Sequence, residues 1–309
     1  MGLIKLLIGN FLYLLGRVKI RGLVDSLKAI YISTSLLIKP NEHYYDLWHK
    51  INLKFFRNNI LPLLDINIHN ANSSNVSDYK IWTVWWQGSN NMPPIIKATY
   101  ESMQNATDKE VVLITKDNVS DYIDIPQYIR NNKNICLAHL SDYIRVALLC
   151  KYGGLWIDST VYCSCKIPSW IFEQSFFTIK ASSKSHKYIP MGKWNMQILG
   201  SNKTNCPVFV FMKEYLEEYW KKYDRALDYL FFDYGMEILY EDNIECKKLI
   251  DNVPYSNEHM HELLPILNDD YDENKYSLIC RDTNFFKLTY KLKFQNINPK
   301  SYYERIVKE

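Results

Sequence analysis

The sequence predicts an α/β protein in which helices cover a parallel or mixed sheet, with a helical extension at the N-terminus. From residue 80 onward, short runs of β-branched and aromatic residues alternate with longer stretches of helical periodicity. Strands that are separated by helices favour a parallel or mixed sheet. Apolar residues make up 47% of the 309-residue chain, which is enough to form a sizeable core.

The N-terminal 40 residues are apolar and basic. The whole chain has a net charge of only +3. The excess positive charge lies in this segment, which has a single acidic residue and the basic residues Lys5, Arg17, Lys19, Arg21, Lys28 and Lys39. Its longest uncharged run spans residues 6–16, whereas a membrane-spanning helix needs about 20 residues. Basic residues rather than a small-residue cleavage site follow this run, so we do not expect a signal peptide.

Two interpretations of residues 1–40 stay open. An apolar run flanked by Lys and Arg suits a helix that lies on an anionic membrane surface. It suits equally an amphipathic helix that packs on the protein's own domain. The charge excess is confined to this segment, so the broad basic patch of a nucleic-acid-binding protein is not expected.

The next segments predict a helix and a linker. Residues 43–65 have a helical pattern as far as Pro62. Asn and Ser dominate the following segment, INIHNANSSNVSDY, which is typical of a linker or a long surface loop. We therefore expect a helical extension over residues 1–67, a linker over 68–78 and an α/β domain over 79–309.

Within the α/β domain, the elements follow from the local patterns. Strands are expected at KIWTVWWQG (80–88), KEVVLITKDN (109–118) and LWIDSTVY (155–162), and further strands at SFFTIK (175–180) and NMQILGS (195–201). The segment LAHLSDYIRVALLCKYGG (137–154) predicts a helix, because two glycines follow it as a left-handed cap requires. Other helices are expected over residues 93–106, 125–132, 206–223 and 225–240.

Several polar residues and glycines fall at predicted strand ends, where open α/β sheets bind ligands. Gly88, Asn118 and Asp158 occupy such positions. The glycine pair 153–154 just before the third strand allows a sharp turn and a close approach of the backbone to a ligand. On the preceding helix, Asp142 and Arg145 are three residues apart and share one face.

Each of these features also has a purely structural interpretation. Asp142 and Arg145 form the usual spacing of a surface ion pair on a helix. Asp158 is able to cap a turn, and Trp85 and Trp86 are able to pack in the core. The convergence of all these residues at one edge of the sheet favours a functional site.

The motifs HLSDYIR and YGGLWIDSTV, with WWQG before them and FFKLTYK after them, resemble the capsular polysaccharide synthesis glycosyltransferases. That family is related to the yeast outer-chain α-1,6-mannosyltransferases and to the clostridial glucosylating toxins. The similarity runs roughly from residue 80 to 292 and is dense over residues 138–162. It implies a GT-A fold and retaining transfer of a sugar from a nucleotide-diphosphate donor, typically a UDP-sugar, to a lipid-linked or oligosaccharide acceptor. The expected location is the cytoplasm, with peripheral contact on the inner face of the membrane if residues 1–40 bind lipid.

The resemblance also implies roles for individual residues. Asp142 corresponds to a residue that binds hydroxyls of the donor sugar, Arg145 approaches the sugar or the phosphates, and Asp158 stands for the first acid of the family's DxD motif. These are the expected catalytic residues. The residues expected to bind the nucleotide-sugar are Trp85, Trp86, Asp142, Arg145, Gly154, Asp158 and Lys287.

The DxD motif is incomplete in this chain. Thr160 stands where the second acid is expected, and a neutral hydroxyl is a weaker ligand for Mn²⁺ or Mg²⁺. Three arrangements stay open: a metal bound by Asp158 and Thr160 with phosphates and water, a site completed by Asp228 or Asp233, or replacement of the metal by basic side chains.

Two other enzyme classes do not match the motifs of this chain. A phosphatase with a DxDx[TV] motif requires an acid at position 160, and a zinc hydrolase requires HExxH, which the pair His259 and His261 does not match. A non-catalytic, glycosyltransferase-like subunit of a capsule assembly complex stays open because of Thr160. The seven cysteines form no CxxC pair, so we expect free, mostly buried thiols in a reducing compartment.

Overall fold

The computed structural model describes residues 2–68 and 73–308, and its centre is a mixed five-stranded sheet. The strand order is β3–β2–β4–β7–β6. The strands are β2 (Ile81–Val84), β3 (Val111–Ile114), β4 (Gly154–Ile157), β6 (Phe177–Thr178) and β7 (Ile198–Ser201). β2 pairs in parallel with β3 and β4, whereas β7 is antiparallel to β4 and β6. The predicted mixed sheet is confirmed.

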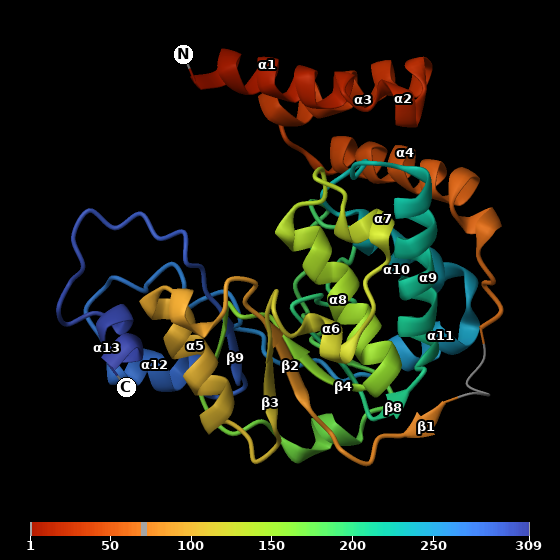
Figure 1. Ribbon diagram of the computed structural model, residues 1–309. Helices are drawn as coiled ribbons and strands as arrows, with labels where there is room; N and C mark the ends of the chain where they lie inside the picture. Colours follow the sequence, from red (N-terminus) through yellow and green to blue (C-terminus); the bar gives the residue numbers. More distant parts are fainter. Residues whose placement is uncertain (1, 69–72, 309) are drawn as a thin grey trace.

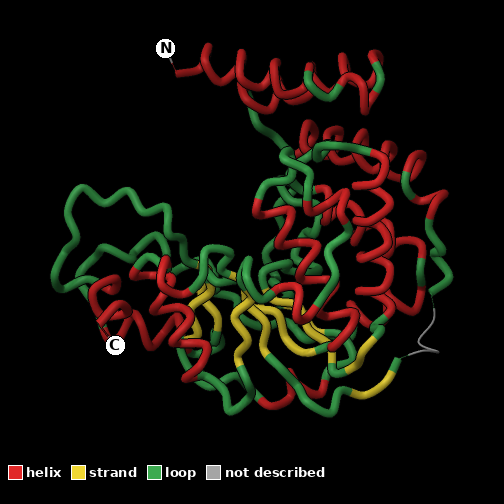
Figure 2. Tube along the Cα trace, viewed as in Figure 1, coloured by secondary structure: helices red, strands yellow, loops and turns green. Residues whose placement is uncertain are grey.

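Two groups of helices lie on either side of the strands, as Figures 1 and 2 show. The larger group is α8 (Leu137–Tyr152), α9 (Pro207–Lys222), α10 (Phe231–Asp242) and α11 (Ile244–Asp251). The smaller group is α5 (Pro94–Asn105), α12 (Glu273–Cys280) and α13 (Tyr302–Lys308). Each group has its own hydrophobic core, so the fold combines a main layer with a smaller C-terminal lobe.

Short elements complete the connections. They are α6 (Val119–Tyr122), α7 (Gln127–Arg130) and the 3₁₀ helices η1 (Leu61–Leu63), η3 (Ser89–Asn91) and η4 (Ser169–Glu173). β1 (Ser74–Asn75) pairs with β8 (Lys203–Thr204) in a separate small sheet. The helix expected over residues 225–240 begins only at Phe231, after a turn in which the Leu230 N–H donates to the carboxylate of Asp228.

The third predicted strand is in fact two strands with a turn between them. β4 ends at Ile157, and β5 (Val161–Cys163) pairs with β9 (Phe285–Lys287) in a different, two-stranded sheet. The turn is closed by a hydrogen bond of 2.8 Å from the Val161 N–H to the Asp158 carbonyl. This break places Asp158 at the carboxyl edge of the central sheet, and the β5–β9 register places Lys287 opposite Val161.

The glycine pair lies at the opposite end of β4. Gly153 and Gly154 have φ angles of +64° and +95°, and a Cβ atom on Gly154 would lie 2.4 Å from the Lys80 carbonyl oxygen. The Trp82 indole donates to the Gly153 carbonyl at 2.9 Å. The glycines therefore allow the α8–β4 turn to pack against β2. Gly154 thus lies at the amino end of β4 and does not line the cavity described below at the carboxyl end; its contact with the donor stays a prediction.

The N-terminal helices form a layer above the main domain (Figure 1). They are α1 (Gly2–Leu15), α2 (Val18–Arg21), α3 (Leu23–Ile38) and α4 (Glu42–Asn59). α1 packs on α3 and α3 on α4. Arg17 donates to the Ala226 carbonyl at 2.8 Å, and Arg21 donates to Asn52 at 2.6 Å.

The fourth helix belongs to the main core. Phe56 of α4 is fully buried and lies in the same hydrophobic cluster as the central sheet. The helical extension thus consists of an outer part, α1–α3, and an inner helix that shares its core with the α/β domain. In the predicted linker, residues 69–72 lie outside the described residues.

Two further expectations concern the whole chain. Within residues 2–68 and 73–308, no helix has both the length and the apolar character needed to cross a membrane. All seven cysteines are free; Cys163, Cys206 and Cys246 are buried, whereas Cys136 and Cys165 are exposed.

Candidate active site at the carboxyl edge of the sheet

A cavity of about 790 Å³ opens at the carboxyl ends of β2 and β4. These two strands are parallel, so the residues that follow each of them reach the same edge of the sheet. α8 and β9 supply further side chains from either side. The expected site residues that line the cavity together are Trp85, Trp86, Asp142, Arg145, Asp158, Thr160 and Lys287.

Asp158 is the centre of the ionic network. Its Oδ1 atom accepts hydrogen bonds from Arg145 Nη2 at 3.0 Å and from Trp156 Nε1 at 2.9 Å. Its Oδ2 atom accepts from Lys287 Nζ at 3.2 Å. Burial opposes ionisation of Asp158, but the charges of Lys287 and Arg145 outweigh it and lower the pKa of the carboxyl group. Asp158 is therefore an anion held between two cations.

The pair on α8 is buried in the cavity wall. Arg145 Nη1 lies 3.4 Å from Asp142 Oδ1, and only 7% of Asp142 and 4% of Arg145 are exposed. The guanidinium lies 5.1 Å from the centre of the Trp156 ring. The interpretation as a surface ion pair is thus wrong, because Arg145 joins Asp142 to Asp158 inside the molecule. Its Nε atom is buried and has no hydrogen-bond partner among the residues that the structure describes.

The two tryptophans lie beyond the end of β2, in the turn toward η3. The Trp85 N–H donates to the Ile114 carbonyl at 3.0 Å, and the Trp85 indole packs edge-on against Tyr290, with ring centres 5.5 Å apart. Trp86 is half-buried against the main core. Both indoles line the cavity, and their role in binding the nucleotide-sugar stays a prediction.

Two expected strand-end residues lie outside the cavity lining. Asn118 closes its own loop, because its amide accepts from the Thr115 N–H at 2.8 Å and donates to the Leu113 carbonyl at 2.9 Å. Gly88 has a φ angle of +81° and forms the turn before η3.

The cavity also includes residues that the sequence did not single out. The segment before β7 contributes Trp194, Asn195 and Gln197. The Asp158 N–H donates to the Gln197 carbonyl at 2.9 Å, because β7 runs antiparallel to β4. Such residues precede a strand rather than follow it. They reach the carboxyl edge only because of this pairing, which the local pattern does not reveal.

Of the two later carboxylates considered for the site, only Asp233 reaches the cavity. It lies on α10 and accepts a hydrogen bond of 2.9 Å from the Trp194 indole. Burial raises the pKa of Asp233 to about 7. Asp228 instead accepts from the Trp48 indole at 3.0 Å and so ties α4 to the main domain.

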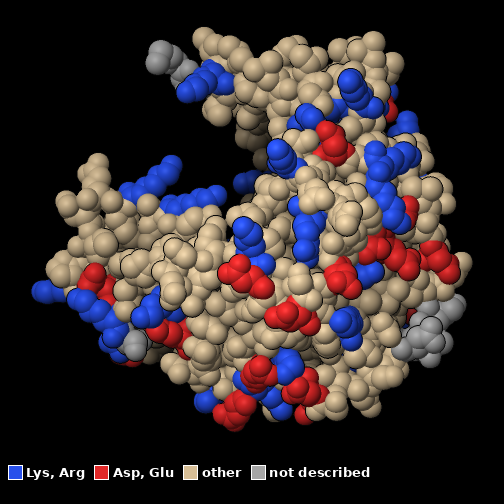
Figure 3. Space-filling model, in the orientation of Figure 1, with Lys and Arg blue, Asp and Glu red and all other residues tan. Residues whose placement is uncertain are grey.

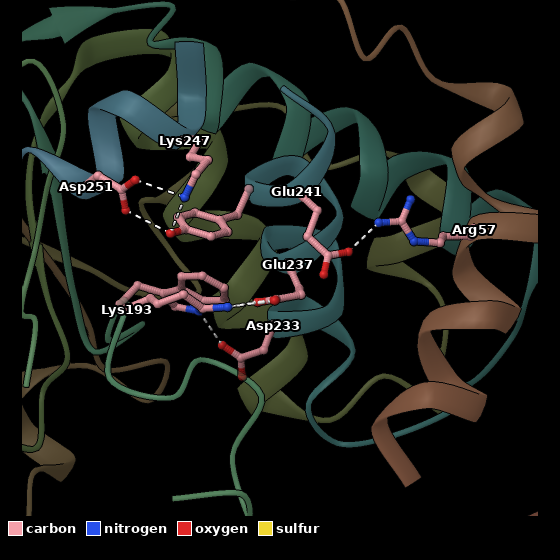
Figure 4. A network of polar contacts seen from close by, with 9 residues as sticks. Arg57, Lys193, Asp233, Glu237, Glu241, Lys247 and Asp251 are labelled. Atoms are coloured by element: carbon pink, nitrogen blue, oxygen red, sulfur yellow. Dashed lines mark hydrogen bonds and ion pairs between the residues drawn. The ribbon is translucent and has the colours of Figure 1, made fainter. Parts of the chain in front are cut away.

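α10 connects this wall of the cavity to the N-terminal helices (Figure 4). Asp233, Glu237 and Glu241 are four residues apart and share one face of the helix. Glu237 accepts from Lys193 at 2.6 Å, and Glu241 pairs with Arg57 of α4. α10 therefore contacts both the cavity-lining segment that contains Lys193 and the helix α4, on which α3 packs.

The side chains beside Asp158 do not fit a divalent metal. Lys287 Nζ donates to the hydroxyl of Thr160 as well as to Asp158, so an ammonium group occupies the space between the two expected ligands. Across the described ranges, no group of three or more His, Cys, Asp or Glu side chains is arranged to hold a metal ion. A cation placed here would also meet the charges of Lys287 and Arg145. Metal binding by Asp158 and Thr160 stays a prediction that this donor set does not support.

Comparisons with known proteins give one family match and several partial similarities. A family model described as capsular polysaccharide synthesis protein matches residues 35–306. O-glycosyltransferase braB of Annulohypoxylon truncatum is 32% identical over 96 residues, which are 27% of this chain and 23% of that protein. The solved PaToxG glycosyltransferase has 14% identity and a TM-score of 0.39, with 77% of this chain and 94% of that chain covered. The apo structure of the bifunctional glycosyltransferase WbbM has 10% identity and a TM-score of 0.40, with 75% and 49% covered.

Proposed function

The chain belongs to the capsular polysaccharide synthesis protein family, and from this premise we propose that it is a glycosyltransferase. It transfers a sugar from a nucleoside-diphosphate donor, a UDP-sugar, to a growing surface polysaccharide with retention of configuration. The observation that supports this proposal best is the ionic network of Asp142, Arg145, Asp158 and Lys287 in the wall of one cavity.

The cavity residues suit the charges that develop in such a reaction. The bond between the sugar C1 and the phosphate oxygen breaks, and the nucleoside diphosphate leaves with additional negative charge. Lys287 and Arg145 are the cations that stabilise it. The sugar becomes oxocarbenium-like, and Asp142 orients its hydroxyl groups. The acceptor oxygen bonds to C1 on the face that the phosphate leaves, and its proton passes to the departing phosphate.

Nucleotide-sugar binding tests the proposal directly. UDP-sugars and GDP-sugars are added to the full chain, and the thermal unfolding temperature is measured, followed by hydrolysis of each donor. We expect a UDP-sugar to stabilise the protein by about 2.7 kcal/mol at 100 times its Kd. If every donor left both unfolding and hydrolysis at background, the enzyme proposal would be wrong and the non-catalytic subunit would remain.

The outer helices support a second part of the proposal, which is peripheral contact with an anionic membrane. α1 and α3 expose many large apolar side chains, including Ile4, Ile8, Leu12, Leu23, Val24 and Leu27. In Figure 3 this layer is mostly uncharged with a few Lys and Arg, and the surface is hollowed between it and the C-terminal lobe. Apolar residues among basic ones suit an interface with anionic lipid, where a lipid-linked acceptor is available.

Charged substitutions on this layer test the membrane contact. Leu12 and Leu27 are each 59% exposed, and burial of each in lipid contributes about 1.5–3 kcal/mol. The double substitution Leu12→Asp with Leu27→Asp should weaken sedimentation with anionic vesicles at least about 100-fold. Ile244→Asp is the matched control, because Ile244 is 64% exposed on α11. Vesicle binding that survives the double substitution, or that the wild type lacks, would contradict the proposal.

A further inference from the structure

The position of the Lys287 ammonium is determined by β-sheet pairing on both sides. Lys287 lies opposite Val161 in the β5–β9 register, and the Leu288 N–H donates to the Thr160 carbonyl at 2.8 Å. The Lys287 N–H donates to the Met260 carbonyl, also at 2.8 Å. The backbone on either side of the side chain is thus held, and the ammonium is aimed at Asp158 and Thr160.

The hydrogen-bonding capacity of this ammonium is only partly used. A lysine ammonium has three N–H donors and no acceptor. One bond to Asp158 Oδ2 and one to Thr160 Oγ1 leave the third donor for a ligand. The side chain lines the cavity and is 23% exposed, so a phosphate oxygen is able to approach it.

The two cations of the site have different tasks. Arg145 contacts both Asp142 and Asp158 and lies deep in the wall, so its charge is largely balanced by carboxylates. Among the residues that the structure describes, Lys287 contacts one carboxylate, that of Asp158, and the neutral hydroxyl of Thr160. Of the two, Lys287 has more charge to offer to an incoming diphosphate.

We propose that Lys287 takes the place of the divalent cation, so that this site binds the diphosphate of its donor without a metal ion. The inference rests on the proposed function and specifies how the donor is held. A metal ion would have to displace Lys287 from both Asp158 and Thr160 and then remain beside two positive charges, which is electrostatically unfavourable.

Binding of UDP and GDP to the full chain by calorimetry, with EDTA or with Mn²⁺, tests the inference. We expect the wild type to bind UDP in EDTA, with a Kd that Mn²⁺ changes by less than about threefold. Lys287→Met should weaken binding about 10–100-fold under both conditions, because a charge-assisted hydrogen bond is lost. Lys109→Met is the matched control, since Lys109 is exposed and precedes β3 at the opposite edge of the sheet. Unfolding temperatures identify any variant that fails to fold.

A second variant tests whether the metal site can be restored. Thr160→Asp combined with Lys287→Met supplies the second acid and removes the competing ammonium. The reference is the free-ion electron paramagnetic resonance signal of Mn²⁺ with UDP and no protein, because UDP itself binds Mn²⁺. This double variant should lower the signal below that reference, and its UDP affinity should depend on Mn²⁺. The wild type should not lower the signal below the reference.

The outcomes separate this inference from the proposed function. UDP binding by the wild type only with Mn²⁺, or equal binding by the wild type and Lys287→Met, would overturn the inference and leave the glycosyltransferase proposal intact. Binding of neither nucleotide, with or without Mn²⁺, would overturn both.

Discussion

Asp158→Asn should lower donor turnover at least about 100-fold, the effect of removing a group that aligns transition-state charge. Asn keeps nearly the same shape and still accepts from the Trp156 indole, but it removes the carboxylate that contacts both Arg145 and Lys287. The two cations then repel each other and lose their common anchor. Sugar release from the best donor measures turnover, and calorimetry measures donor binding.

The control for this variant is Asp117→Asn, at an exposed aspartate in the turn after β3. It should leave turnover unchanged. Thermal unfolding of both variants shows whether the loss of activity reflects chemistry or folding, because breaking a buried ion pair also destabilises a protein. Turnover by Asp158→Asn within about threefold of the wild type would exclude Asp158 from the reaction.

Gly154→Ala should destabilise the fold by at least about 3 kcal/mol, because two costs add. The φ angle of +95° is unfavourable for a residue with a side chain. The new methyl group would also lie 2.4 Å from the Lys80 carbonyl oxygen and 2.7 Å from the Trp82 indole nitrogen. Since the Lys80 carbonyl, just before β2, accepts from the Leu155 N–H of β4 at 2.9 Å, β2 and β4 would have to separate. Urea-induced unfolding measures the change.

Gly88→Ala separates the two costs. Gly88 also has a positive φ, +81°, but an added Cβ would meet nothing within 4 Å. Gly88 has a ψ of 163°, so its backbone lies in a region that is essentially restricted to glycine. Its substitution should cost only the conformational part, about 1–3 kcal/mol. Equal destabilisation by the two variants would show that the close approach of β4 to β2 contributes nothing beyond the backbone conformation.

Local sequence patterns predicted the element types and the cavity edge well. α8 spans Leu137–Tyr152, close to the predicted helix, and its Asp142 and Arg145 face the site as their spacing requires. The position of Asp158 was also predictable, because an apolar run that stops at a charge marks the end of a buried strand. The family resemblance added Lys287, which no local pattern singles out.

The remaining features depend on pairing between distant segments. Residues 155–162 have a continuous β pattern, but β4 and β5 pair with different strands, so the chain turns at Asp158. Gln197 and Asp233 reach the cavity through the antiparallel β7 and through the packing of α10. Periodicity shows which face of a segment is apolar, but it does not show which other element packs against that face. A glycine such as Gly154 likewise allows the close approach of either a ligand or a neighbouring strand. Only the packing shows which of the two is present.

The pairing of β5 with β9 has a consequence for the order in which the molecule is assembled. Asp158 and Lys287 are separated by 129 positions along the chain. During synthesis on the ribosome, Asp158 is therefore made long before Lys287, the cation with which it pairs. Contacts of such high sequence separation form slowly, because a long loop must close first. In a chain that ends before β9, Arg145 is the single cation of the network beside the carboxylates of Asp142 and Asp158, and the final strand supplies the second cation that balances them.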